Sequence, residues 1–203
     1  MNEQEDLTGT LRDRQARDTK ARLIGAALTL FSQKGVGNTS IKEIAREAGV
    51  AQGLLYHYFA SKDDLLWGVL ESDSFLPHLL EVCGDTEGRT AEAVLREVVL
   101  RFDSFLAARQ ARLKLILGEL QSNPRIQALW EEGIDREKSV LQEFLRARIA
   151  SGELRAHDVE VTTRLLMYGV VVLYLPGGGP AGGNQAYLSA MIEMLMPGIR
   201  AEK

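Results

Sequence analysis

The 203-residue chain contains few of the side chains from which metal sites and catalytic centres are made. Cys83 is its only cysteine, and its histidines are His57, His78 and His157. A lone cysteine forms no intramolecular disulfide, which fits the reducing conditions of a cytoplasm. These four residues have neither the spacing of a metal site nor that of a catalytic triad, so we expect no metal, no cofactor and no enzymatic activity.

The sequence also has no apolar run long enough to cross a membrane. Its first twenty residues are polar and charged, without the apolar stretch of a signal peptide. The longest apolar run, residues 165–175, is interrupted by Gly169 and is shorter than a bilayer requires. Because 45% of the residues are hydrophobic, the chain can fill a core, and we expect a folded, cytoplasmic protein with no membrane partner.

Charge is distributed unevenly along the chain. The formal net charge of −4 argues against a surface that is adapted to nucleic acid everywhere. Residues 10–62 nevertheless carry nine basic and four acidic side chains, so the net charge of this segment is +5. Such polarity is expected of a protein that meets phosphates at one end only. The basic residues are Arg12, Arg14, Arg17, Lys20, Arg22, Lys34, Lys42, Arg46 and Lys62.

Glycines and a capping pattern divide the N-terminal part into short helices. Apolar residues recur at helical spacing over residues 18–34, and Gly35 follows, as is common after a helix C-terminus. Ser40, with Glu43 three residues later, has the capping-box pattern that begins a helix over 41–48. Gly49 separates this helix from another over 51–59. Two brief helices joined by a glycine-containing turn form a helix-turn-helix, which places its second helix in the DNA major groove.

The rest of the chain also has helical periodicity, and no segment has the pattern of a strand. A helix is expected over 62–80, where Pro77 should kink or end it. Further helices are expected over 89–108, 111–121, 124–150, 158–175 and 185–196, with a flexible glycine-rich connection over 176–184. We predict an all-α fold of about nine helices, with a flexible arm (1–15), a three-helix helix-turn-helix head (16–62) and a larger helical ligand-binding and dimerisation body (63–203).

One stretch resembles a known family. The residues from Thr39 to Lys62, TSIKEIAREAGVAQGLLYHYFASK, are similar to the signature of the tetracycline-repressor (TetR) family. The resemblance extends over about residues 18–70 and includes the IA..AGV turn, the LYHYF element and the following SK..L. It implies a homodimeric repressor that binds a roughly palindromic operator and releases it when a small-molecule effector binds.

The start of the second short helix supplies the candidate base readers. Gln52 can pair bidentately with adenine, Leu54 can touch a thymine methyl, and Gly53 lets the backbone approach. Lys42 can reach a guanine or a phosphate. The full predicted DNA-binding set is Thr39, Ser40, Lys42, Ala51, Gln52, Gly53, Leu54, Tyr56, His57, Tyr58 and Lys62, in which the hydroxyls, His57 and Lys62 suit phosphates.

Several of these residues have a structural alternative. Tyr56 and Tyr58 are also suited to packing, His57 to simple exposure, and Thr39 and Ser40 to helix capping alone. The basic residues of the arm are either a solvated face or contacts in the minor groove.

The C-terminal two thirds of the chain supply an apolar set that suits a small-molecule pocket or an ordinary core. The pocket candidates are Trp67, Phe75, Phe102, Phe105, Leu117 and Trp130, with Arg112, Glu119 and Gln121 to orient a polar group of the effector. The run over 115–126 resembles the central region of acyl-CoA-responsive family members. The predicted dimer surface comprises Val161, Leu165, Leu166, Val170, Leu173, Tyr174, Leu188, Met191, Ile192 and Leu195.

Two other functions remain open from the residues alone. A ligand-independent DNA-binding dimer would have a filled, dry core in its body, whereas an effector sensor would have an internal cavity. An enzyme would use the helical pocket for catalysis. The glycine-rich segment 176–184 lacks the GK[ST] ending of a phosphate-binding loop, and we interpret it as a linker.

Overall fold

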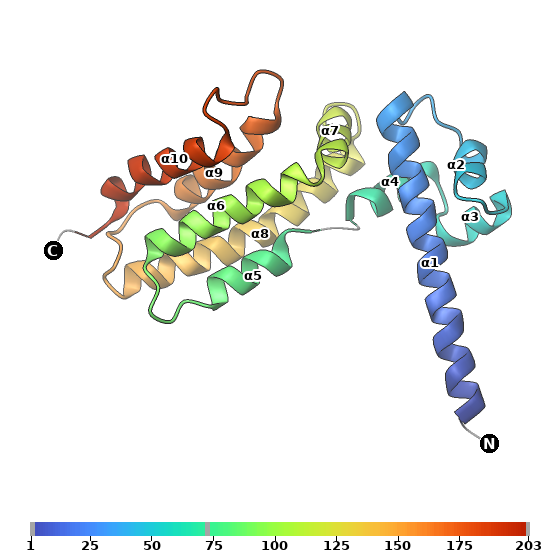
Figure 1. Cartoon of the computed structure of the whole chain (residues 1–203), viewed down its shortest axis with the longest axis horizontal. Coiled ribbons are helices and arrows are strands. Elements are labelled where there is room, and N and C mark those ends of the chain that lie inside the picture. The colour runs from blue at the N-terminus through green and yellow to red at the C-terminus, as the bar shows by residue number, and fades with distance from the viewer. Residues whose placement is uncertain (1–2, 72–73, 202–203) are drawn as a thin grey trace. The chain divides into compact units, whose positions relative to one another are not determined.

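The predicted all-α class is confirmed. In the computed structural model, residues 3–71 and 74–201 are described, with the backbone alone for residues 3–11 and Leu129, and these residues contain no β-strand. The helices, labelled in Figure 1, are α1 (Glu3–Lys34), α2 (Ile41–Glu47), α3 (Gln52–Tyr58), α4 (Lys62–Glu71), α5 (Leu76–Gly84), α6 (Ala91–Ala107), α7 (Gln110–Glu119), α8 (Pro124–Ala150), α9 (Val159–Val171), the 3-10 turn η1 (Val172–Tyr174) and α10 (Asn184–Ile199).

The helix expected over 62–80 is two helices, so the expected effect of Pro77 is wrong. Pro77 lies in the first turn of α5, where its missing N–H has no intrahelical partner to lose. Glu137 of α8 accepts hydrogen bonds from the Ser74 hydroxyl (3.2 Å) and the Phe75 amide (3.1 Å) just before this helix. Burial raises the pKa of the Glu137 carboxyl. Pro77 therefore begins a helix whose preceding residues are held by α8.

The arm predicted to be flexible is helical from Glu3 onward, and α1 has 32 residues. Met1 and Asn2 lie outside the described residues. The reason for the difference lies in composition. Residues 3–17 contain no proline and only one glycine, so nothing interrupts a helix that the buried residues further along nucleate.

The chain divides into two compact units, which are not the predicted domains. The head unit comprises residues 1–73 and 111–126, and the body unit comprises residues 74–110 and 127–203. The boundary expected at residue 62 moves because α4 and part of α7 supply head core, including Leu65, Leu66 and Leu115. An ion pair between Arg125 and Asp64 (2.6 Å) also ties the first turn of α8 to α4.

The head core forms where α1, α2, α3 and α4 meet. Leu23 and Phe31 of α1, Ile44 of α2 and Leu55 of α3 are almost fully buried in it. Helices α2 and α3 have seven residues each, too few to persist alone, so tertiary packing must stabilise them. Phe59, which ends α3, lies so close to α4 that a Cβ on Gly68 would stand 2.7 Å from its ring.

Helix α2 begins with the predicted capping box, which is confirmed. The Ser40 hydroxyl accepts a hydrogen bond from the Glu43 amide, and the Glu43 carboxylate accepts one from the Ser40 amide (2.9 Å). The Lys34 ammonium of α1 donates to the same carboxylate (2.8 Å). This hydrogen bond, with those from Ser40, lowers the pKa of Glu43 from 4.5 to about 2. Lys34 thus joins the end of α1 to the start of α2.

In the body unit, helices α5, α9 and α10 pack against α6. The glycine-rich connection before α10 is anchored, in contrast to the prediction of a flexible segment. Asp103 of α6 accepts hydrogen bonds from the Tyr174 hydroxyl (2.6 Å) and the Asn184 side-chain amide (2.7 Å), one at each end of the connection. Only glycine fits at position 178, because a Cβ there would lie 1.8 Å from the carbonyl oxygen of Val172.

The Lys34–Glu43 contact makes the titration of Glu43 depend on Lys34. We expect Lys34→Met to raise the pKa of Glu43 from about 2 toward its ordinary value. Lys42→Met removes the same charge from the residue next to Glu43 and should leave the pKa of Glu43 low. A depressed pKa stabilises the folded head above the unfolded pKa, and this contribution is lost as the pH falls through about 2. NMR titration of the Glu43 carboxyl carbon measures the midpoint. The same midpoint in both variants would contradict this assignment.

Candidate DNA-binding site

Helix α3 presents one face to solvent and the other to the head core. Gln52, Gly53 and Tyr56 are exposed, and Leu54 is 40% exposed although it is apolar. Leu55 is fully buried and anchors the opposite face. Ala51, the N-cap residue, is exposed with extended backbone. The structure therefore places the predicted base readers together on one accessible face.

The turn between α2 and α3 is held by Arg22 of α1. The Arg22 guanidinium donates hydrogen bonds to the carbonyl oxygens of Ala48 and Gly49 (3.1 Å to the latter). Gly49 has φ +64°, in the left-handed region that favours glycine. Since these carbonyls directly follow α2, with Val50 and Ala51 between them and α3, Arg22 holds the turn that leads into the second helix. In the sequence Arg22 is recognisable only as a basic charge, because its partners lie 26 and 27 residues away.

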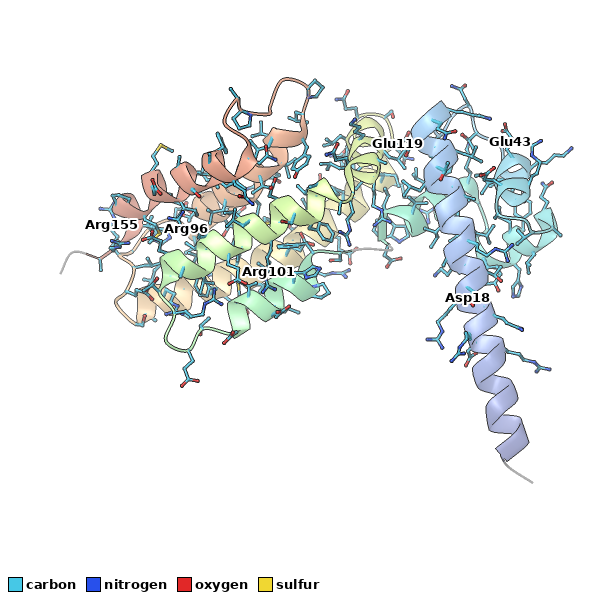
Figure 2. The ribbon with its side chains drawn as sticks, viewed as in Figure 1. Asp18, Glu43, Arg96, Arg101, Glu119 and Arg155 are labelled. Carbon is cyan, nitrogen blue, oxygen red and sulfur yellow. The ribbon has the colours of Figure 1, made fainter. Side chains whose placement is uncertain are left out.

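The residues proposed for phosphates occupy different environments. Ser40 and Lys42 are exposed at the start of α2, and Tyr56 and His57 are exposed on α3. Tyr58 is half-buried beside the head core, with the His57 ring edge-on to it at 5.5 Å. Figure 2 shows Glu43 on α2 among the side chains of this part of the head. Most of the predicted phosphate contacts are thus available to a ligand.

Thr39 is a correction to the predicted set. Its side chain is only 2% exposed, and its hydroxyl donates to the carbonyl oxygen of Gly35 (2.8 Å). The hydroxyl therefore belongs to the connection after α1 and not to a DNA-facing surface. Thr39 is not a helix cap either, because the N-cap of α2 is Ser40.

Lys62 has a structural role that sequence analysis did not anticipate. Its ammonium donates to the carbonyl oxygens of Val36 (2.8 Å) and Thr39 (3.2 Å), in the connection between α1 and α2. An ammonium group has three N–H bonds, so one is left for a phosphate. The contact that we predicted for Lys62 stays a prediction.

The predicted effector-binding residues are divided between the two units. Trp67, Arg112, Leu117, Glu119 and Gln121 belong to the head unit, whereas Phe75, Phe102, Phe105 and Trp130 belong to the body unit. Gln121 is exposed, and the other head residues are half-buried. Neither unit therefore contains the whole predicted set.

Three of the body candidates form an aromatic cluster. The Phe75 ring centroid lies 4.8 Å from that of Phe102 and 5.4 Å from that of Phe105. Phe75 is 1% and Phe102 7% exposed, and the Arg109 guanidinium lies 4.0 Å from the Phe105 centroid. In this structure these rings pack as body core.

A surface groove of about 490 Å³ runs along the outer face of α6. Its lining includes Glu92, Arg96, Glu97 and Arg101, and it contains no predicted effector residue. Arg96 pairs with Glu92 (3.2 Å) and Arg101 with Glu97 (2.6 Å). Figure 2 labels Arg96 and Arg101 on this helix. The groove is lined by charges that already neutralise one another.

The predicted dimer surface requires correction. Half of its residues are buried in the body's own core, because the faces of α9 and α10 that carry them pack within the unit: Leu166, Val170, Leu173, Leu188 and Ile192. Tyr174, Met191 and Leu195 are half-buried, and Tyr174 is bonded to Asp103. Val161 and Leu165 are exposed, at 51% and 56%.

Other exposed apolar residues extend this face of α9. Tyr168 and Val172 are 42% and 40% exposed, and with Val161 and Leu165 they recur at spacings of four, three and four residues. This spacing places them on one side of a helix. Tyr168 and Val172 are not in the predicted dimer surface, because periodicity identifies an apolar face but not which part of it the rest of the chain covers.

In the described part of the chain, no helix is long and apolar enough to span a membrane. A search of the same residues finds no cluster of three or more His, Cys, Asp or Glu side chains that could hold a metal ion.

Two segments of the chain match known protein families. Residues 23–67 match the family described as bacterial regulatory proteins, tetR family, whose model is the helix-turn-helix DNA-binding domain. Residues 93–170 match the AefR-like transcriptional repressor, C-terminal domain. The HTH-type transcriptional regulator AcrR of Shigella flexneri is 30% identical over 173 residues, which cover 79% of this chain and 80% of that protein.

Solved structures have the same fold. The transcriptional regulator FadR from Bacillus subtilis, in complex with stearoyl-CoA, has a TM-score of 0.74 at 24% identity, covering 89% of this chain and 99% of that one. Salmonella enterica GusR has a TM-score of 0.72 at 22% identity, covering 88% and 94%. With its helix-turn-helix matched and a 30% identical relative over most of both chains, the protein belongs to the tetR family of bacterial transcriptional regulators.

Proposed function

We propose that the protein is a homodimeric repressor that binds a palindromic operator through α3 and releases it when a largely apolar effector binds. The accessible face of α3, fixed on a buried core, is the observation that carries this proposal. Because its partner is operator DNA, we infer that it acts in the cytoplasm. A ligand-independent dimer is the second candidate, supported by the close packing of the Phe75 cluster.

Gln52, at the start of α3, is the residue that reads a base directly. Its exposed amide can donate to and accept from the major-groove edge of one adenine. Lys42, Ser40, Tyr56 and His57 surround it with groups that suit phosphates, which position the head but do not select a sequence. Specificity and general affinity would then reside in different side chains.

We assign dimerisation to the exposed face of α9 and the first residue of η1, here called the α9 stripe: Val161, Leu165, Tyr168 and Val172. Contiguous exposed apolar residues on a folded unit indicate an interaction surface. A two-fold axis through such a stripe would bring the same residues of two copies together and would present two α3 helices to a palindromic site.

The effector class is proposed from chemistry and from one relative. The body unit is rich in apolar side chains, which suits a ligand with a long hydrocarbon part. The solved FadR of similar fold was crystallised with stearoyl-CoA. We therefore place acyl-CoA thioesters first among candidate effectors, acting through different affinities for the DNA-bound and free states.

Selection from a random-sequence DNA library with the purified protein should yield a palindromic site. On that site, Gln52→Ala should lose about 1–3 kcal/mol of binding free energy and its preference at one symmetric pair of positions. Lys42→Ala should weaken binding to all variants of the site alike. Competition titrations with single-base variants measure both effects. An unchanged base preference in Gln52→Ala would remove Gln52 as a reader.

The α9 stripe can be tested with two leucines of nearly equal exposure. Leu165→Arg should give a monomer, because a charge replaces an apolar contact at the proposed two-fold interface. Leu80→Arg on α5 is the control, since Leu80 is 54% and Leu165 56% exposed. Sedimentation equilibrium at micromolar concentration reports the mass. A wild-type monomer, or a dimeric Leu165→Arg variant, would overturn the proposed surface.

Effector release can be followed by fluorescence anisotropy on the selected duplex. Stearoyl-CoA should lower the anisotropy at fixed protein concentration, and coenzyme A without an acyl chain should leave it unchanged, because the apolar part provides the binding free energy. No response to any chain length in an acyl-CoA series would favour the ligand-independent dimer. A rise in anisotropy would reverse the proposed sign of regulation.

A further inference from the structure

Helix α1 is much longer than its buried part requires. Its almost fully buried residues begin at Leu23, and the match to the family's DNA-binding model also begins at residue 23. The described helix extends twenty residues further toward the N-terminus, to Glu3. Within the head, α1 runs past α2 and α3, as Figure 1 shows. None of residues 12–22, the part of the extension whose side chains are described, is buried in the head core.

Two contacts locate α3 along α1. Arg22 holds the carbonyl oxygens of Ala48 and Gly49 in the turn before α3, and the Lys20 ammonium lies 5.9 Å from the ring of Phe59, which directly follows α3. The turn before α3 and the residue after it thus both contact residues 20–22 of α1. The extension begins at the level of the DNA-reading helix.

Basic side chains continue along the extension from this point. At about 1.5 Å per residue, Arg17 lies roughly 4.5 Å and Arg12 roughly 12 Å along the axis from Lys20. At about 100° per residue, Arg17 and Arg12 are rotated by roughly 60° and 80° from Lys20, on opposite sides of it. We call these three residues the α1 basic strip. Asp13 lies on the same side, so the strip has three positive charges and one negative charge.

The strip is exposed to solvent. Arg12, Arg17 and Lys20 are all exposed, and Arg17 also donates to the backbone carbonyl of Asp13 in its own helix (3.3 Å). Arg14 is exposed too; it is rotated by about 120° from Lys20 but only by about 60° from Arg17, so it lies at the edge of the strip. Figure 2 shows side chains radiating from α1 around the labelled Asp18.

We infer that the α1 basic strip binds the DNA phosphates that flank the bases read by α3. The major groove is about 12 Å wide, so phosphates border α3 at distances that the strip reaches. A helix about 10 Å across does not fit a minor groove about 6 Å wide, so the backbone of the arm stays outside it and the strip lies along the phosphates. This inference rests on the proposed operator binding and lengthens the footprint beyond the helix-turn-helix.

The test compares Arg12→Gln/Arg17→Gln with Lys114→Gln on α7 of the head unit, because glutamine preserves helix propensity while removing charge and Lys114 is exposed. The probe is the duplex selected by the wild-type protein, with long flanks. In anisotropy titrations over a salt series, the double variant should lower the slope of log K against log salt by about 0.9 per lost phosphate contact. Lys114→Gln should keep the wild-type slope, and Asp13→Asn should bind more tightly.

Trimming the flanks from the duplex adds a geometric check. The wild-type protein should lose affinity on the trimmed site, and the double variant, which keeps only Lys20 of the strip, should lose less. An equal change of slope in Lys114→Gln would indicate a general effect of charge, and no change in the double variant would indicate a solvated face; either result overturns the strip. If the wild-type protein selects no site at all, the proposed operator binding fails instead.

Discussion

The structure of the head depends on the anchoring of a seven-residue helix. Helix α3 is too short to form alone, so its position comes from Leu55 and Phe59 in the core and from Arg22 at the preceding turn. The Arg22 hydrogen bonds satisfy carbonyls at the end of α2, where a helix leaves such groups unpaired. Because α3 is anchored on both sides along the chain, the residues of its exposed polar face are free to contact DNA and are not needed to stabilise the fold.

Local sequence patterns correctly predicted the features of the fold that depend on interactions between residues near one another in the chain. The capping box at Ser40 and Glu43, the glycine turn and the helix boundaries around α2 and α3 depend on residues that are near one another in the chain, and they appear in the structure. Pro77 was misjudged because proline suits the first turn of a helix as well as it ends one. The contacts that hold the residues just before this helix come from Glu137, sixty residues away from Pro77 in the sequence.

Tertiary burial accounts for most of the other differences. Thr39 is a polar residue in a loop, and only the fold reveals that it is buried. Leu166 and Leu165 are adjacent and chemically identical, yet the first is core and the second is 56% exposed. Periodicity could not separate them, since α9 is apolar on most sides. The role of Lys62 likewise depends on carbonyls more than twenty residues distant.

Amide chemical-shift mapping with the selected duplex shows whether the accessible face of α3 is the DNA-binding surface. We expect the largest shifts at Gln52, Gly53 and Tyr56 and at the start of α2, with smaller shifts around Lys20 and Arg17. Shifts confined to the body unit, or shifts along α1 and α2 that leave α3 unchanged, would contradict this assignment.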